Sequence, residues 1–194
     1  MREKYGSRIR KQYGISEKEF VLLFVGSSFE RKGLPLIIRS LRKICKKLDQ
    51  AARLVVIGEG NIQKYEALAE RLGCRKKILF IGSCYDPQPW YGAADLFVLP
   101  TIYDACSSAV LEALACGIPV ITTRFNGASE IVEKKECGVI LENPRDREAF
   151  TSAVVELFDE KKRQKMALEA RKAVTPYSVE NFLKNTVRFY HEIA

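Results

Sequence analysis

The stretch Leu99–Pro119, LPTIYDACSSAVLEALACGIP, decides the fold because it contains the end of a strand, a short loop and a complete helix. Its first residue closes the apolar run Leu96–Leu99, which predicts a buried strand. A polar loop containing Asp104 follows, and Ser107 or Ser108 can cap the helix after it. The closing Gly-x-Pro is a typical stop signal, so the stretch predicts a strand–loop–helix unit.

The helix of this stretch has an apolar side and a side with a carboxylate. At about 100° per residue, Val110, Leu111 and Leu114 share one side, and Glu112 lies on the other. We therefore expect the leucine side to pack on a sheet and Glu112 to point away from it. A helix N-terminus at the end of a strand offers free N–H groups to an anion, usually phosphate. The spacing alone does not require a ligand-binding role. It is equally compatible with Glu112 as a solvated surface glutamate and with Asp104 as an ordinary turn residue.

The rest of the chain alternates between strand-like and helix-like segments about 25–30 residues apart, which predicts a parallel sheet with right-handed crossovers. Strands are expected at 20–25, 53–57, 77–81, 96–99, 120–123 and 138–141, and helices at 34–48, 62–72, 86–94, 107–117, 129–135, 146–159, 161–173 and 178–193. The strands are continuous apolar runs, so helices should cover both faces. We predict an α/β, doubly wound parallel sheet of about six strands with extra C-terminal helices.

Three parts of the chain are expected to differ in role. Residues 1–19 form a linker or leading helix outside the core, residues 20–175 a Rossmann-like domain, and residues 176–194 a C-terminal helix. The composition, with 47% hydrophobic residues in 194, supports a real core. No apolar run reaches ~18 residues, so no transmembrane helix is expected, and no apolar signal region begins the chain.

The cysteine content and the net charge restrict the range of possible functions and locations. Six scattered cysteines and one histidine argue against a zinc site or a disulfide framework and favour a reducing cytoplasm. The net charge of +8 is concentrated at residues 2–11, 39–47 and 161–165. This distribution suits an anionic ligand and an anionic membrane surface, so we expect a cytoplasmic protein, peripheral at the inner face of the membrane. Solvated helix faces explain the charge equally well. No nucleic-acid-binding motif is present, so nucleic acid is not an expected partner.

Polar side chains follow several strands at the carboxyl edge, where ligands bind in such sheets. They are Arg31 and Lys32 after the first strand and its terminal Gly26, Glu59 after the second, Ser83 to Asp86 after the third, Asp104 after the fourth and Asn126 after the fifth. Two adjacent cations beside a glycine loop suit a diphosphate, since Arg supplies a bidentate fork and Lys a point charge. The same pair equally fits the solvated start of a basic helix.

Motifs along the chain resemble those of the family-4 retaining glycosyltransferases, which have two Rossmann-like domains (the GT-B fold). The pattern Asp104-x7-Glu112 with ALACGIPV after it is similar to the family's acidic-x7-Glu signature, although the family usually has Glu at the first position. Further motifs occur in order over about residues 20–160: FVG at 24–26, RKG at 31–33, VIGEG at 56–60, FIG at 80–82 and YGAADLFVLP at 91–100. Lipopolysaccharide-core glucosyltransferases are a similar subgroup.

The resemblance implies a hexosyltransferase whose donor-binding, C-terminal domain is this chain. By the family pattern, Arg31 and Lys32 would hold the donor diphosphate, Asp104 the transferred sugar and Glu112 the ribose. Arg31, Lys32 and Asp104 are thus the expected catalytic groups. The remaining expected donor contacts are Gly26 in the phosphate loop, Ser83 in the loop that meets the base, and the backbone N–H groups of Ala105, Cys106 and Ser107. The family implies no metal or cofactor, and a UDP-sugar is the expected donor.

The resemblance also implies a partner, the N-terminal acceptor-binding domain that the chain lacks. Without it, we expect the chain to bind a nucleotide-sugar donor but to transfer little or no sugar to a glycan or lipid-linked acceptor. One alternative is a non-catalytic nucleotide-binding or interaction module of the same fold. A sugar-nucleotide epimerase is a weaker alternative, because the glycine fingerprint and a Tyr-x3-Lys pair are absent.

Overall fold

Six parallel strands form one sheet at the centre of the protein. The computed structural model describes residues 5–49 and 51–193. Its strands are β1 (Phe20–Val25), β2 (Ala52–Ile57), β3 (Ile78–Gly82), β4 (Leu96–Leu99), β5 (Val120–Thr123) and β6 (Gly138–Leu141), in the order β3-β2-β1-β4-β5-β6. All neighbouring pairs are parallel. The predicted doubly wound sheet is therefore confirmed.

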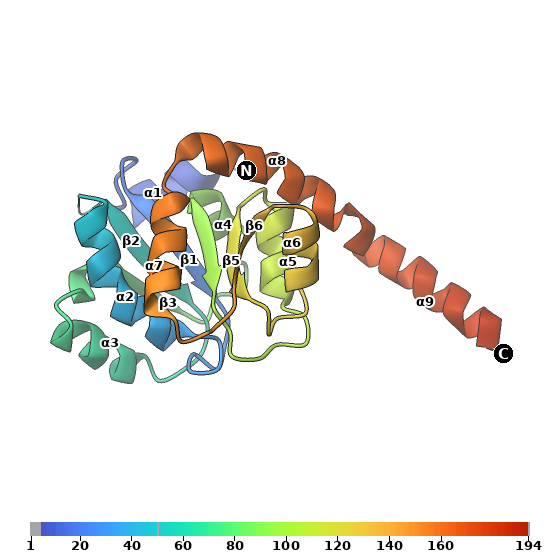
Figure 1. Ribbon diagram of the computed structural model, residues 1–194, viewed down its shortest axis with the longest axis horizontal. Coiled ribbons are helices and arrows are strands. Elements are labelled where there is room, and N and C mark those ends of the chain that lie inside the picture. The colour runs from blue at the N-terminus through green and yellow to red at the C-terminus, as the bar shows by residue number, and fades with distance from the viewer. Residues whose placement is uncertain (1–4, 50, 194) are drawn as a thin grey trace.

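Helices cover both faces of the sheet, as Figure 1 shows. They are α1 (Ser7–Gln12), α2 (Leu34–Lys47), α3 (Ile62–Arg71), α4 (Gln88–Ala93), α5 (Ser108–Ala115), α6 (Ser129–Lys134), α7 (Arg147–Glu156), α8 (Glu160–Val174) and α9 (Val179–Ile193). Helix α2 contacts α3 and α7, whereas α8 contacts α5 and α6, so the helices form two layers with the sheet between them.

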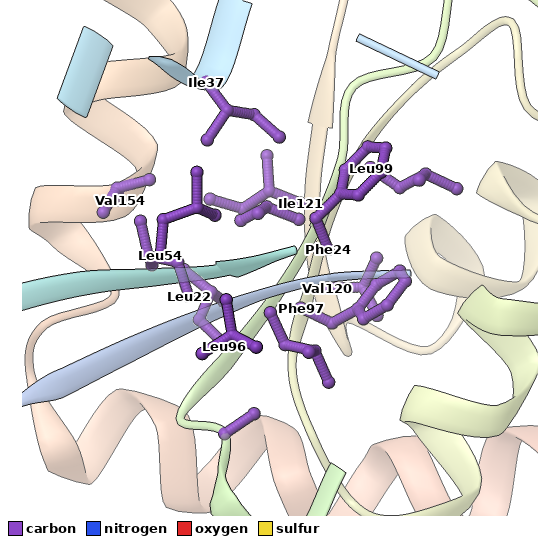
Figure 2. Close-up of a cluster of buried hydrophobic side chains, with 14 of the residues drawn as sticks. Leu22, Phe24, Ile37, Leu54, Leu96, Phe97, Leu99, Val120, Ile121 and Val154 are labelled. Carbon is purple, nitrogen blue, oxygen red and sulfur yellow. The ribbon is translucent and has the colours of Figure 1, made fainter. Parts of the chain in front are cut away.

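The core consists of the strands and the inner sides of these helices. Figure 2 shows side chains from β1, β2, β4 and β5 meeting Ile37 of α2 and Val154 of α7. Leu22, Leu54 and Leu96 are fully buried. Burying each such side chain contributes roughly 1.5–3 kcal/mol. The continuous apolar runs of the sequence are thus explained by burial on both faces of the sheet.

Helix α5 buries a different arc from the predicted one. Val110 and Leu114 are fully buried as expected, but Ala113 is buried too, and Leu111 is only partly buried. The reason is that α5 contacts α8 as well as β4 and β5. Two packing partners cover more of the helix than the sheet alone would.

The two ends of the chain differ in how they join the body. The predicted leading helix is α1, but the expectation that this stretch lies outside the core is wrong, because Arg10 and Ile15 are buried. Arg2 and Lys4, two of the cations counted above, lie outside the described residues. At the other end, α9 extends away from the body, and none of its described residues is buried. No helix in the described part of the chain is long and apolar enough to cross a membrane.

Candidate functional site

The strand order places a topological switch point between β1 and β4, and the space beyond the carboxyl ends of these two strands is called the crevice below. The chain winds from β1 toward β3 on one side and from β4 toward β6 on the other, so the connections leave these two strands in opposite directions. Ligands of doubly wound sheets bind at this switch point, beyond the carboxyl ends of the strands. The loop 26–33 after β1 and the loop 100–107 after β4 therefore flank the crevice.

An ion pair joins the two loops. The Lys32 ammonium donates to the Asp104 carboxylate, and both side chains are largely buried, with 13% and 12% exposed. The Lys32 stem passes over Gly26, since a Cβ placed on that glycine would lie 3.6 Å from Lys32 Cγ. The structure thus brings Gly26, Lys32 and Asp104 together, three residues that the sequence predicted for one site.

Backbone contacts hold the loops in this register. The Arg31 carbonyl accepts from the Ile102 N–H at 2.8 Å, and the Arg31 guanidinium donates to the Tyr103 carbonyl at 2.6 Å. Gly33 has φ of 86°, and a Cβ on it would lie 2.1 Å from the Pro100 carbonyl oxygen. Only glycine suits both that dihedral angle and that close approach.

A third loop, after β5, supports the Asp104 loop from behind. The Asp104 N–H donates to the Phe125 carbonyl at 2.9 Å, and the Gly127 N–H donates to the Asp104 carbonyl at 3.0 Å. A Cβ on Gly127 would lie 1.9 Å from the Ala105 carbonyl oxygen, so the two loops approach as closely as backbone allows. Asp104 therefore sits in a fixed backbone, with only its side chain directed to Lys32.

The N-terminus of α5 is held by the side chain of Asn126, from the loop after β5. Ser107 is at the capping position, but its hydroxyl forms no cap bond. Instead the Ser107 N–H donates to Asn126 Oδ1 at 3.3 Å, and Asn126 Nδ2 donates to Thr122 Oγ1 at 3.0 Å. The predicted Ser107 N–H contact is thus already used within the protein, whereas the first-turn N–H groups of Ser108 and Ala109 have no acceptor within the helix.

Glu112 lies on the side of α5 that faces α4. Its Oε2 accepts from the Tyr91 hydroxyl at 2.8 Å, and Glu112 is exposed, as are Ser108 and Ala115 on the same side of the helix. Burial, and after it the Glu112 charge, raises the pKa of the Tyr91 hydroxyl, so Tyr91 remains a hydrogen-bond donor at neutral pH. With Oε2 held in this way, Oε1 can accept from a ligand.

The remaining predicted residues are more dispersed. Ser83 donates to Glu59 Oε1 at 2.7 Å, which links the ends of β3 and β2 rather than contacting the Lys32–Asp104 pair. Ala105 and Cys106 are exposed in the crevice loop. Partial desolvation of the Cys106 thiol by its neighbours, and after it the Asp104 charge, raises the pKa of that thiol. The roles assigned to all nine site residues stay predictions.

One residue of this site, Tyr91, was not predicted to be in it. Asn126 was expected at this edge because it follows the fifth strand, but its hydrogen bond with the Ser107 N–H was not predicted. Tyr91 gave no local signal, because its contact with Glu112 spans 21 positions. Within residues 5–49 and 51–193, no three His, Cys, Asp or Glu side chains are grouped as metal ligands. A groove of about 810 Å³ lies at the opposite edge of the sheet, beside Phe20 and α8, and contains none of the nine predicted residues.

Comparison with known proteins supports the assignment of these motifs to a glycosyltransferase family. The model of the family Glycosyl transferases group 1 matches residues 7–173. The chain is 35% identical to the lipopolysaccharide glucosyltransferase WaaG of Escherichia coli over 145 residues, which are 75% of this chain and 39% of that protein. It is 33% identical to the uncharacterized glycosyltransferase MJ1607 of Methanocaldococcus jannaschii over 93% of this chain and 47% of the relative.

Solved structures agree with the sequence comparisons. The crystal structure of WaaG has a TM-score of 0.82 and 32% identity, covering 89% of this chain and 47% of WaaG. Anabaena Alr3699/HepE in complex with UDP-glucose has a TM-score of 0.82 at 20% identity, covering 96% and 52%, which shows a common fold alone. The chain spans about half the length of these relatives or less. With 167 consecutive residues matched by the family model, the chain belongs to the group 1 glycosyltransferases.

Proposed function

We propose that this chain binds a nucleoside-diphosphate sugar, with a UDP-sugar as the preferred donor, and forms the donor half of a retaining hexosyltransferase. The observation that supports this most is the Lys32–Asp104 ion pair at the switch point between β1 and β4. A cation for the diphosphate and a carboxylate for the sugar hydroxyls lie side by side there. Glu112, one turn into α5, supplies a carboxylate for the ribose.

The chemistry follows from these groups. As the bond between the sugar and the diphosphate breaks, negative charge develops on the departing diphosphate. Lys32, Arg31 and the free first-turn N–H groups of α5 would stabilise that charge, and such preorganised electrostatics is a major source of catalysis. Asp104 would orient the sugar by accepting hydrogen bonds from its hydroxyl groups. No metal or cofactor is needed for these roles.

A second domain completes the proposal. The relatives are about twice as long as this chain, and α9 presents an apolar side without a partner in the described residues. Both observations favour an acceptor-binding domain that would complete the cleft. We further propose a cytoplasmic location at the inner face of a membrane, in agreement with the kinship to a lipopolysaccharide glucosyltransferase.

Calorimetric titration with UDP, GDP and ADP tests donor binding. We expect the tightest binding for UDP, and no binding by any of the three at millimolar concentration would overturn the proposal. Lys32→Ala should weaken UDP binding about 10- to 100-fold, because a hydrogen bond to a charged group is worth roughly 1.5–3 kcal/mol. Lys64→Ala is the matched control, since Lys64 is also a cation but is exposed and paired with Glu30.

The non-catalytic alternative needs a separate test. In a protein that contains both domains, Glu112→Ala should abolish most sugar transfer, while the loss of its hydrogen bond with Tyr91 should lower the unfolding free energy by only about 1–2 kcal/mol, which leaves the protein folded. Unchanged transfer would favour a binding module of the same fold. Retained donor binding with lost transfer would instead assign Glu112 to the reaction rather than to the ribose.

A further inference from the structure

A second groove, separate from the crevice, lies between α2, the end of α3 and the start of α7. Its volume is about 620 Å³. Figure 1 shows the three helices that surround it. Its floor includes Cys45, whose thiol contacts the carbonyl of Ala52 at the first residue of β2. The groove therefore lies toward the edge where the strands begin, whereas Lys32 and Asp104 lie at the edge where they end.

The groove is strongly basic. Seven of its eleven described lining residues are Lys or Arg, and none is Asp or Glu. Four of them, Arg39, Arg42, Lys43 and Lys46, have the spacing i, i+3, i+4, i+7 and form one stripe along the outer side of α2. Arg71, Lys77 and Arg147 come from three other segments and face this stripe.

Helix stability does not account for this arrangement. Cations in the last turn of a helix interact favourably with its dipole, which explains Lys46 in α2 and Arg71 in α3. Arg39 and Arg42 lie more than a turn before the end of α2, where that effect has faded. Like charges at these spacings repel each other. Of the cations in the groove, Arg42, Lys46 and Arg71 are exposed and form no ion pair with any described Asp or Glu.

The chemistry of the lining selects the ligand. Guanidinium groups bind phosphate oxygens through two parallel hydrogen bonds, and several converging cations suit a ligand with more than one phosphate. The described lining contains no aromatic side chain on which a base could stack and no carboxylate that could accept from sugar hydroxyls. We propose that the α2–α3–α7 groove is a second anion site that binds clustered phosphate groups, independently of the donor crevice.

Clustered phosphates can come from lipid headgroups or from a soluble compound, and two probes distinguish these sources. The first is cosedimentation of the whole chain with vesicles of phosphatidylcholine and phosphatidylglycerol, compared with pure phosphatidylcholine. The second is calorimetric titration with inorganic tripolyphosphate. Binding to the anionic vesicles assigns the site to lipid headgroups, and binding to tripolyphosphate without vesicle binding assigns it to a soluble phosphate compound.

The decisive variant is the triple substitution Arg42→Gln, Lys46→Gln, Arg71→Gln, whose side chains are exposed, so the fold should be retained. Since each Lys or Arg near an anionic surface contributes roughly a fivefold gain in affinity, we expect about a 100-fold loss of vesicle binding. The matched control is Lys18→Gln, Lys134→Gln, Lys135→Gln, which removes three exposed cations that lie outside the three basic segments and outside any ion pair in the described structure. Binding should survive in this control.

Two results would overturn the proposal. One is that the chain binds neither the anionic vesicles nor tripolyphosphate at low ionic strength, where electrostatic attraction is greatest. The other is an equal loss in the groove variant and the control, because that would reflect net charge rather than the groove. UDP titration of the groove variant should match the unsubstituted chain, so a failure here is distinguishable from a failure of the donor proposal.

Discussion

Lys32 and Asp104, 72 positions apart, form a largely buried ion pair that joins the loops on the two sides of the switch point of the sheet. Its two members have different proposed tasks, because Lys32 would bind the diphosphate and Asp104 the sugar. In the structure they neutralise each other. A donor must therefore redistribute the contacts of Lys32 between its phosphates and Asp104, which makes the pair the place where the two tasks can be separated.

Asp104→Asn tests this separation. The substitution keeps the shape but removes the charge, so Lys32 becomes free for phosphate while the sugar loses its charged acceptor. We expect UDP affinity to stay the same or rise, and UDP-sugar affinity to fall about tenfold, since a charged hydrogen bond is worth roughly 1.5–3 kcal/mol. Calorimetric titrations with UDP and with UDP-glucose measure how the ratio of the two affinities changes on substitution. An equal fall for both ligands would show that Asp104 serves only to position Lys32.

Tyr91→Phe tests the link between α4 and Glu112. Tyr91 is 2% exposed, and losing its hydrogen bond to a carboxylate should cost about 1–2 kcal/mol of unfolding free energy at pH 7. Burial raises the pKa of the Tyr91 hydroxyl in the folded state above its unfolded value of about 10. Its stabilising contribution is therefore complete below pH 10 and is lost as the pH rises beyond it.

Urea unfolding at several pH values measures this effect. The stability difference between the unsubstituted chain and Tyr91→Phe should be constant from about pH 7 to 9 and then shrink above pH 10 by up to about 1.4 kcal/mol per pH unit. A difference that stays flat up to pH 11 would contradict the buried hydrogen bond. In the protein with both domains, Tyr91→Phe should also weaken donor binding, because Glu112 would lose its fixed orientation.

The sheet could be predicted from the sequence because each strand is a short apolar run bounded by residues that favour turns or loops. Phe20–Val25 and Val120–Thr123 lie at the predicted residues, since both are buried on two faces and no other period fits them. The location of the crevice could also be predicted, because the carboxyl ends of parallel strands meet at one edge of the sheet independently of the side chains. The same reasoning found the α5 helix and its terminal glycine, which has φ of 72°.

Contacts between distant segments could not be found in this way. Asn126 accepts from the Ser107 N–H at the start of α5 across 19 positions, and Arg10 is buried in a segment that is rich in basic residues. No local pattern distinguishes Arg10 from the exposed Arg8 or Lys11. What decides its burial is Asp95, 85 positions away. Tertiary partners of this kind become visible only when the fold is assembled.

Arg10 supplies a stability prediction of its own. Its guanidinium pairs with Asp95 at 2.7 Å, both side chains are at most 4% exposed, and it also donates to the carbonyls of Ala93 and Glu19. Arg10→Met should lower the unfolding free energy by about 3–5 kcal/mol, because it leaves the Asp95 carboxylate buried without its cation. Lys11→Met, at an exposed neighbour, should stay within about 0.5 kcal/mol. Urea unfolding of both variants makes the comparison, and similar values for the two would refute the structural role of Arg10.

Helix α9 presents an apolar side that the rest of the described chain leaves uncovered. Phe182 is 65% exposed and Phe189 57% exposed, and their spacing of seven places them on the same side of the helix. Such a side favours association, either with an acceptor-binding domain or between copies of this chain. We expect Phe182→Glu with Phe189→Glu to abolish concentration-dependent association in sedimentation velocity, without lowering the unfolding temperature of the body, because α9 buries no residue in it.

The control for α9 adds the same two charges to its other side. Asn181→Glu with His191→Glu lies about 90° or more around the helix from Phe182, so association should persist in that variant. If both pairs of substitutions abolish association, general repulsion rather than the apolar side would be responsible. If the phenylalanine variant unfolds at a clearly lower temperature, α9 must pack on the body in solution, and its apolar side would then serve the fold of this chain rather than a second domain.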